Sequence, residues 1–384
     1  MHILVFLLCV LGGKTPAQEF KTVHPGIEYA HVDRKLGNDP VKINLLRLHL
    51  KKVRLDVHHA FDKAIGVEPT SVIAADHNAI AAINGGFFRL DKTEFNGDAA
   101  GILVINGELL SDSHNDRIAM RIRNRKERTD VWFDHLKSEV WFSRFSDAGA
   151  QASGINRERK PSEIIVYTSE FGTSTLTNQL GSEIVFGECA GKCNVRFVES
   201  GGNSPIPRGG FVVSFSPERR GDAELMRSAI RNIHGDSGKA ANLHTKVFAL
   251  NEPIPFRLER TDDITNGVAR LIKSGKIDIT WEQEKASKSF AEMRHPRTAV
   301  AKLKDGKFLM ITVDGRQPGV SVGMTLQELA DYILSLGATD AINLDGGGST
   351  TMYLDGKVVN TPSEKDGERK VSDAILVTLR NTRR

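Results

Sequence analysis

Cysteine is scarce in this chain, and that scarcity limits the kinds of site that the chain can build. Only 3 of the 384 residues are cysteine. Cys9 lies in the apolar N-terminal stretch, whereas Cys189 and Cys193 lie close together in "GECAGKCNV". A structural zinc site takes about four ligands, and no histidine stands near this pair at ligand spacing. Two neighbouring cysteines in an exported chain more often form a disulfide, so we expect a small disulfide loop.

An excess of charge of one sign is also lacking. The formal net charge is only +4, although 26% of the residues are charged. Nucleic-acid-binding and membrane-surface proteins concentrate basic charge, so the composition supports neither class. The basic run "RIRNRKER" at 121–128 is typical of one solvated strand face. We therefore expect no nucleic-acid partner and no stable membrane insertion.

Long apolar runs are missing. The most apolar stretch, "MHILVFLLCVLGGKTPAQ" at the N-terminus, is too short to span a bilayer, which takes about 20 residues. It has the shape of a secretory signal, with a cleavage position after Ala17. The alternative is a buried N-terminal strand. We expect a signal peptide at 1–17, a secreted or periplasmic protein, and a single large domain at 18–384; the sequence does not indicate an oligomeric state.

Short apolar runs separated by Gly, Asn and Asp make up much of the chain. Such runs predict strands, and apolar residues at helical spacing predict helices. We expect strands within 20–110 and 117–145 and helices near 67–79 and 221–234. Residues 146–205 have weak periodicity and predict loops or an insertion. The stretch around 111–204 is therefore treated as a less typical insertion in the domain.

The C-terminal part has the clearest pattern. A buried-type strand ends at Asp314, the helical stretch "GMTLQELADYILSLGA" begins with a Thr325–Glu328 capping box, and a second strand ends at Asp345. Strand, helix and strand at this spacing form a βαβ crossover with parallel strands. Both aspartates then emerge at the carboxyl-terminal edge, where α/β sheets bind ligands. The predicted fold class is α/β (α+β), with a mixed β-sheet core, flanking helices and a C-terminal βαβ unit that carries the site.

Three consecutive glycines follow Asp345 in "INLDGGGSTTMYLDGK". The chain then continues into a hairpin, so this is not a Gly-Lys-Ser/Thr phosphate loop, which leads into a helix. Bare backbone here can gather N–H groups into an anion-binding concavity, or let a ligand approach closely. A strained turn without a ligand is the alternative. The residues expected to bind substrate in this loop are Gly346, Gly347, Gly348, Ser349 and Thr350.

Six motifs occur in a fixed order: "NGGFF", "HPRTAVA", "VDGR", "GMTLQELADYILSLGA", "NLDGGGSTTM" and "RKVSDAI". Together they resemble the phosphodiester glycosidase family, that of the mannose-6-phosphate uncovering enzyme and its bacterial, exopolysaccharide-associated relatives. The resemblance covers roughly 78–110 and 205–380. It implies an exported hydrolase that splits a sugar from a sugar-1-phosphodiester and leaves a phosphomonoester. Two departures are Ala301, where relatives usually have glycine, and the poorly matching stretch at 111–204.

The residue types fit this chemistry. A carboxylate stabilises the oxocarbenium-like state of glycosyl cleavage, as nucleophile or as base for water. Asp345 is our first candidate for that role and Asp314 the second. A phosphate group needs fixed cations, and arginine suits bidentate phosphate recognition. The further candidates for substrate binding in the matched motifs are Asn84, Gly85, Arg297, Arg316 and Arg369.

Neighbouring aromatic and histidine residues have plainer interpretations. We assign Phe87 and Phe88 to the core in preference to a sugar platform, and His295 to a loop in preference to a general acid. Carboxylates with backbone oxygens could bind calcium, but the spacing has no EF-hand pattern. We expect no metal and no cofactor.

Two alternatives stay open beside the phosphodiester glycosidase. One is an ordinary glycosidase or lyase that acts on a surface polysaccharide. The other is a non-catalytic module that binds a carbohydrate or a phosphate at the same edge. Asp314, Arg316 and Asp345 together favour catalysis, because a binding module would not require two carboxylates beside a phosphate site.

Overall fold

The structure is a computed structural model, and it describes residues 19–143, 150–190, 192–198, 200–232, 242–250 and 255–380. Strands dominate the described residues, and helices flank them, so the fold is a mixed α+β fold built from several sheets. The predicted signal peptide at 1–17 lies outside the described residues. The prediction of an α+β fold with flanking helices is confirmed.

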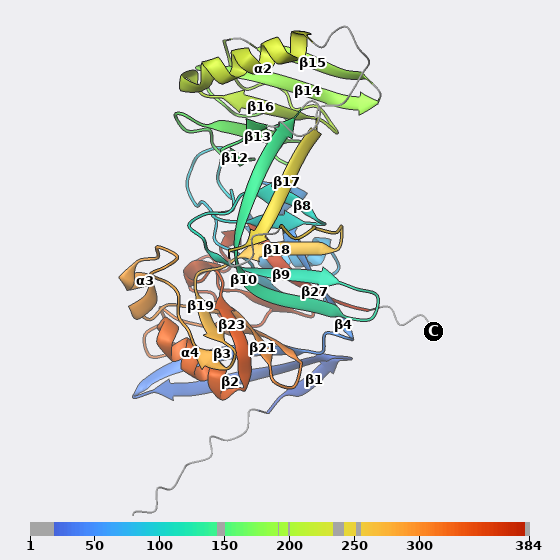
Figure 1. The fold of residues 1–384 in the computed structure, drawn as a ribbon. Coiled ribbons are helices and arrows are strands. Elements are labelled where there is room, and N and C mark those ends of the chain that lie inside the picture. Colours follow the sequence, from blue (N-terminus) through green and yellow to red (C-terminus); the bar gives the residue numbers. More distant parts are fainter. Residues whose placement is uncertain are drawn as a thin grey trace, which may run out of the picture.

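An eight-stranded sheet forms the lower part of the molecule in Figure 1. Neighbouring strands in this sheet run antiparallel to each other. Its strands, in spatial order, are β1 (Lys21–His24), β2 (Ile27–Leu36), β3 (Asp39–Leu48), β22 (Phe308–Val313), β21 (Arg297–Leu303), β23 (Ala338–Asn343), β19 (Arg270–Lys273) and β20 (Lys276–Ile277).

Helix α4 (Leu326–Ser335) packs against β23, β19 and β20 of this sheet. The predicted capping box is present: the Thr325 hydroxyl accepts from the Glu328 N–H at 3.0 Å, and the Glu328 carboxylate accepts from the Thr325 N–H at 2.9 Å. Leu329 and Ile333 are buried in the apolar cluster beneath the helix. The helix therefore forms where its apolar spacing and cap predicted it.

Strand β21 lies between β22 and β23 and runs antiparallel to both. Strands β22 and β23 therefore run in the same direction, as a helical crossover requires, but they are not neighbours. Asp314 directly follows β22, and Asp345 comes two residues after the end of β23. Both aspartates leave the sheet at the same edge.

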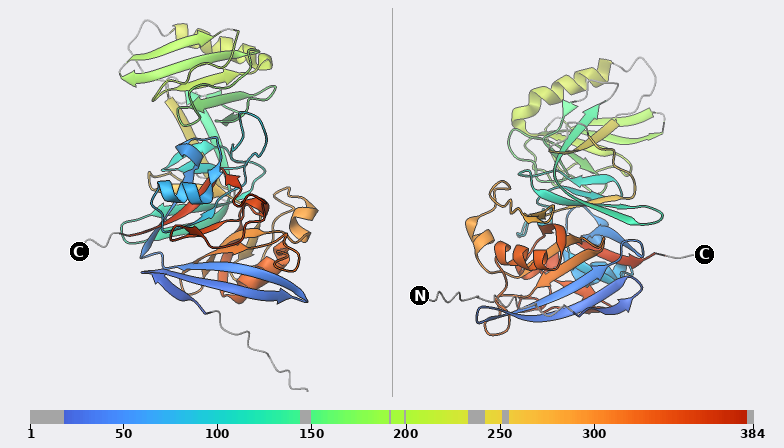
Figure 2. Two further views of the ribbon diagram at one scale, coloured as in Figure 1. Left: turned by 180° about the vertical axis from the view of Figure 1, so that it is seen from behind. Right: turned by 60° about the horizontal axis from the view of Figure 1, so that its bottom comes forward.

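A five-stranded antiparallel sheet lies above the first and places a strand from residues 81–84 between two C-terminal strands. Apolar side chains from both sheets, including Leu46, Ile83 and Ile375, share one buried cluster. Helix α1 (Thr70–Asp76) packs against β6, β24 and β27, as the view from behind in Figure 2 shows. The strand order is β25 (Lys357–Val358), β24 (Met352–Leu354), β6 (Ala81–Asn84), β27 (Asp373–Leu379) and β4 (Val53–His59).

The upper part of the molecule consists of two further sheets (Figure 1). The long strand β10 pairs with β9 over its first half and with β17 over its second half. The first of these sheets contains β11 (Ala150–Gln151), β10 (Thr129–Ser143), β9 (Ile118–Asn124), β18 (Asp262–Asn266), β7 (Leu103–Ile105) and β8 (Glu108–Ser111), with β17 (Asn242–Ala249) beside β10. The second contains β12 (Gly154–Ile155), β13 (Ile164–Thr168), β16 (Phe211–Phe215), β14 (Ser182–Ala190) and β15 (Lys192–Val198), and α2 (Arg220–Asn232) packs on it.

Of the loops or insertion expected over 146–205, the loop prediction does not hold for the whole stretch. Strands β11 to β15 lie in it, and it contributes to apolar clusters in which Ile165, Tyr167 and Phe186 are buried. Its strands pair with β10 and β16, which lie outside the stretch, so local periodicity carries little of the information that forms them. Non-local pairing overrides weak local preference in such sheets.

The two remaining cysteines are backbone partners. Cys189 of β14 pairs with Cys193 of β15 across the end of their hairpin. Their side chains lie outside the described residues, so the disulfide stays a prediction. The short elements that complete the fold are η1 (Ala60–Asp62), β5 (Glu68–Pro69), η2 (Pro217–Arg219), α3 (Lys288–Glu292), η3 (Gly347–Ser349) and β26 (Lys370–Val371).

None of the helices in the described part of the chain has the length and apolar character that a membrane crossing requires.

Candidate active site

A cavity of about 320 Å³ opens beside the loop that follows β23. This volume suits a small ligand, because ligand pockets start at about 300 Å³. Five of the six sequence motifs contribute to its wall, although they are spread over nearly 300 residues. The lining residues are Phe87, Ser287, Ser289, Phe290, His295, Pro296, Arg297, Arg316, Asp345, Gly346, Gly347 and Arg369.

Asp345 supplies the carboxylate of this wall. Burial raises its pKa to about 6, although the Ser349 hydroxyl, the Gly346 N–H and the Arg369 charge each act to lower it. The Gly346 N–H donates to Asp345 Oδ1 at 2.9 Å. The Ser349 hydroxyl lies close enough to lower the pKa, but it has no hydrogen bond of regular geometry. Asp345 is therefore ionised at neutral pH and yet basic enough to take part in proton or glycosyl transfer.

The glycine loop does not gather all three N–H groups into a concavity, which was the first of the two roles expected for it. The Gly346 N–H is bound by the Asp345 carboxylate, and the Gly347 N–H donates to the Pro296 carbonyl oxygen at 2.9 Å. Two of the three donors therefore already have acceptors in the protein. Gly346 and Gly347 still line the cavity, but as bare backbone.

Arginine side chains explain the absence of Cβ atoms in this loop. Gly347 has φ +61°, which disfavours other residues, and a Cβ atom there would lie 2.9 Å from Arg316 Nη2. A Cβ atom on Gly348 would overlap the Arg369 guanidinium and the Glu364 carboxylate. The triplet lets two guanidinium groups lie directly against the backbone beside Asp345.

Arg297 is a buried cation in the cavity wall. It begins β21 and is only 1% exposed. Its Nε donates to the Met324 carbonyl oxygen at 2.8 Å, and its Nη2 donates to that of Phe290 at 2.7 Å. Burial lowers its pKa to about 10, and the neighbouring Arg316 charge acts in the same direction. Carbonyl oxygens satisfy its hydrogens without neutralising its charge, so this site favours an anion.

The other two arginines lie nearer the solvent. Arg316 follows β22, is exposed, has φ +60°, and makes no ion pair with any residue that the structure describes. Arg369 is partly buried and pairs with Glu364. Because Arg316 also lowers the pKa of Arg297, the two cations repel each other across the cavity. A bound anion would relieve that repulsion.

His295 and Phe87 lie in the cavity wall. The predicted loop position of His295 and core position of Phe87 therefore describe these residues only in part. Burial, followed by the charges of Arg297 and Arg316, lowers the pKa of His295, which favours its neutral form. Phe87 packs partly on the core, as expected, but also lines the cavity and meets Phe290 edge-on at 5.8 Å between ring centroids. The pair gives the cavity one apolar side.

Asn84 and Gly85 hold the backbone of Asp345 and do not line the cavity. Asn84 is fully buried; its Nδ2 donates to the Asp345 carbonyl oxygen at 2.8 Å, and its Oδ1 accepts from the Thr298 hydroxyl at 2.7 Å. The Gly85 carbonyl oxygen accepts from the Asp345 N–H at 3.2 Å. In this conformation both residues position the carboxylate and are not placed to touch a ligand.

Asp314, the second catalytic candidate, is also absent from the cavity wall. It is 1% exposed, and burial raises its pKa. Its carboxylate accepts from Asn360 Nδ2 at 3.0 Å and from the Thr361 N–H at 3.1 Å. Asn360 Nδ2 also donates to the Thr350 carbonyl oxygen at 3.0 Å. Asp314 thereby connects the loop after β22 to the end of the glycine loop.

Ser349 and Thr350 are buried, and their hydroxyl oxygens lack hydrogen bonds of regular geometry. Ser349 lies against the Asp345 carboxylate, whereas neither residue lines the cavity. Of the substrate-binding candidates, the structure therefore brings Arg297, Arg316, Arg369, Gly346 and Gly347 together around Asp345. It sets the remaining candidates one layer behind, as supports.

Sequence reasoning missed Asp373 as a support of the site. This buried residue begins β27; its Oδ1 accepts from the Gly86 N–H at 3.0 Å and its Oδ2 from the Thr265 hydroxyl at 2.6 Å. A Cβ atom on Gly85 would overlap its carboxylate, which explains that glycine. In the motif "RKVSDAI", Asp373 stands directly before the apolar residues of a predicted strand. That position was the signal by which the sequence could have identified it.

Other cavities lie elsewhere, among them one of about 510 Å³ beside Lys51 and Arg125–Arg128. Another of about 240 Å³ is lined by β14, β15 and α2, and a third of about 670 Å³ lies beside β10 and the β21–β22 turn. None of these three is lined by a residue of the six motifs. The cavity at Asp345 combines residues of the motifs with a carboxylate of raised pKa.

Comparison with solved structures supports the fold over nearly the whole chain. A hypothetical protein from Synechocystis superposes with a TM-score of 0.74 at 22% identity, over 95% of this chain and 64% of that chain. A putative exported protein from Burkholderia pseudomallei K96243 superposes with a TM-score of 0.72 at 21% identity, over 88% of this chain and 74% of that chain. At these identities the likeness concerns the fold alone.

Sequence comparison is more specific but more local. N-acetylglucosamine-1-phosphodiester alpha-N-acetylglucosaminidase from Bos taurus is 34% identical over 129 residues, which are 30% of this chain and 24% of that protein. The SPbeta prophage-derived uncharacterized protein YomE of Bacillus subtilis (strain 168) is 40% identical over 87 residues, 22% of this chain and 13% of that protein. The matches therefore span less than a quarter of the length of these relatives. The phosphodiester glycosidase family model also matches residues 194–378, which contain five of the six motifs. The resemblance predicted from these motifs is confirmed, and this part of the chain is similar to the phosphodiester glycosidase family.

Proposed function

We propose that the protein is an exported hydrolase that cleaves the glycosyl–phosphate bond of a sugar-1-phosphodiester. The observation that carries this proposal is the charge arrangement of the cavity: one carboxylate, Asp345, beside three guanidinium groups. The products are the free sugar and a phosphomonoester. We take the sugar to be of the N-acetylglucosamine type or a related one, as the name of the bovine relative suggests.

In this reaction the bond from C1 of the sugar to the phosphate oxygen breaks, and the electron pair leaves with the phosphate. Water supplies the oxygen that replaces it at C1. Asp345 attacks C1 or removes the proton of the attacking water, and both roles require its ionised form. A carboxylate with a pKa of about 6 meets that requirement at neutral pH.

The arginines suit the leaving group. A phosphate ester leaves as a stable anion, so charge stabilisation contributes more than protonation does. Arg297 presents a buried charge that carbonyl oxygens do not neutralise, and Arg316 is free of ion pairs within the described residues. Fixed cations of this kind stabilise negative charge as it develops on the phosphate oxygens.

An ordinary glycosidase is less compatible with this cavity. It needs a second carboxyl group, about 5–9.5 Å from the first, to protonate a poor leaving group. Asp345 is the one carboxylate among the described residues that line the cavity, and Asp314 is held behind the wall by Asn360 and Thr361. The proposal that the protein is exported rests on the apolar N-terminal stretch and on the likeness to a putative exported protein.

The test compares two substrates that share one sugar. The purified protein is assayed on a sugar-1-phosphodiester, such as a UDP-sugar or a methyl-phospho-sugar, and on the matching aryl glycoside. We expect turnover of the phosphodiester and little or none of the glycoside. Equal rates, or a preference for the glycoside, would refute the proposal in favour of a polysaccharide hydrolase; tight binding without turnover would identify a binding module.

A further inference from the structure

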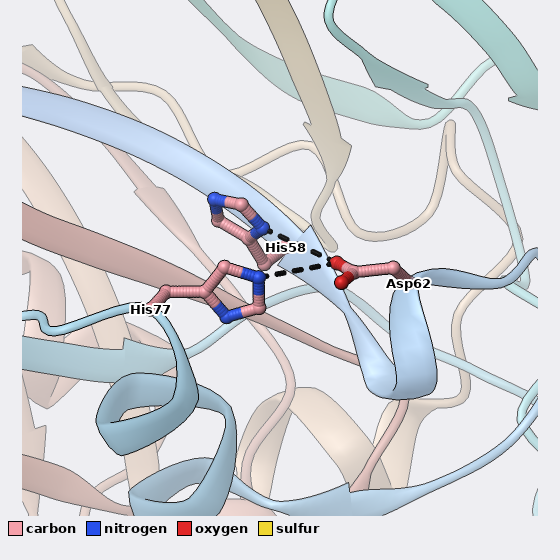
Figure 3. Close-up of side chains that lie close together, drawn as sticks. All are labelled: His58, Asp62 and His77. Atoms are coloured by element: carbon pink, nitrogen blue, oxygen red, sulfur yellow. Dashed lines mark hydrogen bonds and ion pairs between the residues drawn. The ribbon is translucent and has the colours of Figure 1, made fainter.

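A second cluster of reactive side chains lies at the edge of the five-stranded sheet. His58 is the penultimate residue of β4, Asp62 ends the short helix η1, and His77 follows the last residue of α1 (Figure 3). The three residues come from three elements and none of them lines the cavity at Asp345. One nitrogen or oxygen atom of each lies within 4.8 Å of the corresponding atoms of the other two.

The separations match those of a metal site. His58 Nδ1 lies 3.4 Å and His77 Nε2 lies 3.2 Å from the same oxygen, Asp62 Oδ1. Two ligands at the Zn–N and Zn–O distances of a tetrahedral zinc ion are about 3.3 Å apart. The 3.4 Å contact is longer than most direct hydrogen bonds. These atoms are therefore spaced as ligands of one ion are spaced, and only loosely as hydrogen-bond partners.

The tautomer of His77 strengthens this interpretation. His77 Nδ1 lies 2.9 Å from the Ile73 carbonyl oxygen, which can only accept, so Nδ1 carries the hydrogen. In the neutral ring the lone pair is then on Nε2, and it faces the Asp62 carboxylate oxygen. Two acceptors face each other unless a cation lies between them. Histidine ligands of metals commonly have their second nitrogen fixed by a carbonyl in this way.

The arrangement of the rings disfavours protonation of both histidines at once. The His58 and His77 rings are tilted by 36° with their centroids 3.6 Å apart, so two imidazolium charges there would repel each other. One divalent ion would serve both nitrogens and the carboxylate at once. The backbone supports the geometry: Phe61 and Asp62 have φ of 58° and 50°, an unfavourable conformation for non-glycine residues, and this turn brings the carboxylate back to the rings.

We propose that His58, Asp62 and His77 bind a zinc ion. Two imidazole nitrogens with one carboxylate suit zinc, whereas magnesium and calcium prefer all-oxygen sites. The Asp62 side chain is 67% exposed, which leaves a fourth position to water. The ion would join the end of α1 and the η1 turn to β4. None of its ligands lines the cavity at Asp345, so its binding is independent of the proposed hydrolysis.

The test is zinc binding by the purified full-length chain after treatment with a chelator. Calorimetry should give one tight Zn²⁺ site per chain, with far weaker binding of Mg²⁺. Co²⁺ in place of Zn²⁺ should give the visible absorption of a tetrahedral site. Asp62→Asn and His77→Gln should each weaken Zn²⁺ binding by about 100-fold or more, because each variant loses a metal ligand. Loss of a residue that only hydrogen-bonds to a ligand already lowers metal affinity by about 10–100-fold.

The matched control is His24→Gln, which removes another histidine–aspartate pair, His24 Nε2 to Asp355 Oδ1 at 2.6 Å. It should leave zinc affinity unchanged. A wild-type chain that binds no zinc, or variants at Asp62 and His77 that bind it as tightly as the wild type, would overturn the proposal; the second result would place the ion at other residues. Circular dichroism of each variant verifies that the comparison is made on folded protein.

Discussion

Two carboxylates, Asp345 in the lower part of the molecule and Glu183 in the upper part, each line a cavity with arginines in its wall but differ in their hydrogen bonds. Glu183, on β14, is 1% exposed and makes no ion pair among the described residues; its four hydrogen bonds come from the Thr175, Thr177 and Ser214 hydroxyls at 2.7–2.8 Å and from the Ser204 N–H at 2.9 Å. Asp345 accepts one regular hydrogen bond, from the Gly346 N–H, and faces arginines across an open cavity.

The difference separates a carboxylate that supports the fold from the one that we propose to be reactive. The oxygens of Glu183 are occupied by neutral donors, so the side chain holds strands together and has little left for a ligand. The Asp345 oxygens accept one regular hydrogen bond, and they lie beside a cavity that has arginines in its wall. Enclosure alone does not identify an active-site acid; the unused lone pairs do.

The largest expected effect is that of Asp345→Asn. Loss of a catalytic carboxylate should lower kcat/KM on a sugar-1-phosphodiester by about 10³–10⁴-fold, while the melting temperature stays near that of the wild type. Asp314→Asn is the companion variant. Because Asp314 supports a loop and does not line the cavity, its loss should lower the melting temperature more and the rate less. The reverse ranking of the two rates would move the catalytic role to Asp314.

Arg316→Met should have the next largest effect. Arg316 is exposed and makes no ion pair within the described residues, so its loss should not harm the fold. Removal of one donor to a developing anion costs about 10²–10³-fold, and we expect a loss near the lower value in kcat/KM on the phosphodiester. Arg128→Met, an exposed arginine paired with Asp130, is the control and should have wild-type kinetics. Equal losses in both variants would deny Arg316 a specific role.

The pH profile should show Asp345 directly. Its pKa is raised from 3.8 to about 6, so kcat/KM should rise about tenfold per pH unit below pH 6 and level off above it. The same shift means that the folded chain binds more protons than the unfolded chain between about pH 4 and 6, so the contribution of Asp345 to stability falls as pH rises through that window. Asp345→Asn should remove this stability change. A flat rate profile between pH 5 and 7 would contradict the assignment.

The smallest effect on activity is expected for Glu183→Gln. The amide nitrogen cannot accept from the donors that surround the carboxylate, so the free energy of unfolding should fall by about 1–3 kcal/mol. Denaturant titration measures that change. Activity on the phosphodiester should match that of the wild type, and a large loss of activity would extend the functional region into the upper sheets.

Local features of the chain were predictable from the sequence. The capping box of α4, the hairpin at Asp355–Gly356 and the strand ends before Asp314 and Asp345 all depend on residues within a few positions of one another. The strands at 146–205 were not predictable, because their partners lie far along the chain and their polar residues obscure the alternation.

The site was predictable in composition and less so in arrangement. The motifs identified Asp345 and the arginines that surround it. They could not tell that the Asn84 side chain is bonded within the protein while Phe87, three residues later, lines the cavity, because both lie at the end of the same strand. The proposed zinc ligands escaped notice because His77 is distant in sequence from the His58–Asp62 pair. They come together only because α1 packs on the sheet whose edge strand is β4.

The placement of β6 between β24 and β27 has a consequence for the order of folding. Met352 and Ile375 both pair with Ile83, so the middle strand of that sheet waits for partners more than 260 residues later in the chain. Closing so long a loop costs conformational entropy before any pairing compensates for it. The carboxylate of Asp345, tied to Asn84 on that strand, therefore reaches its final position only when the last part of the chain has been synthesised and paired. Until then the residues of the cavity wall at Asp345 are not brought together.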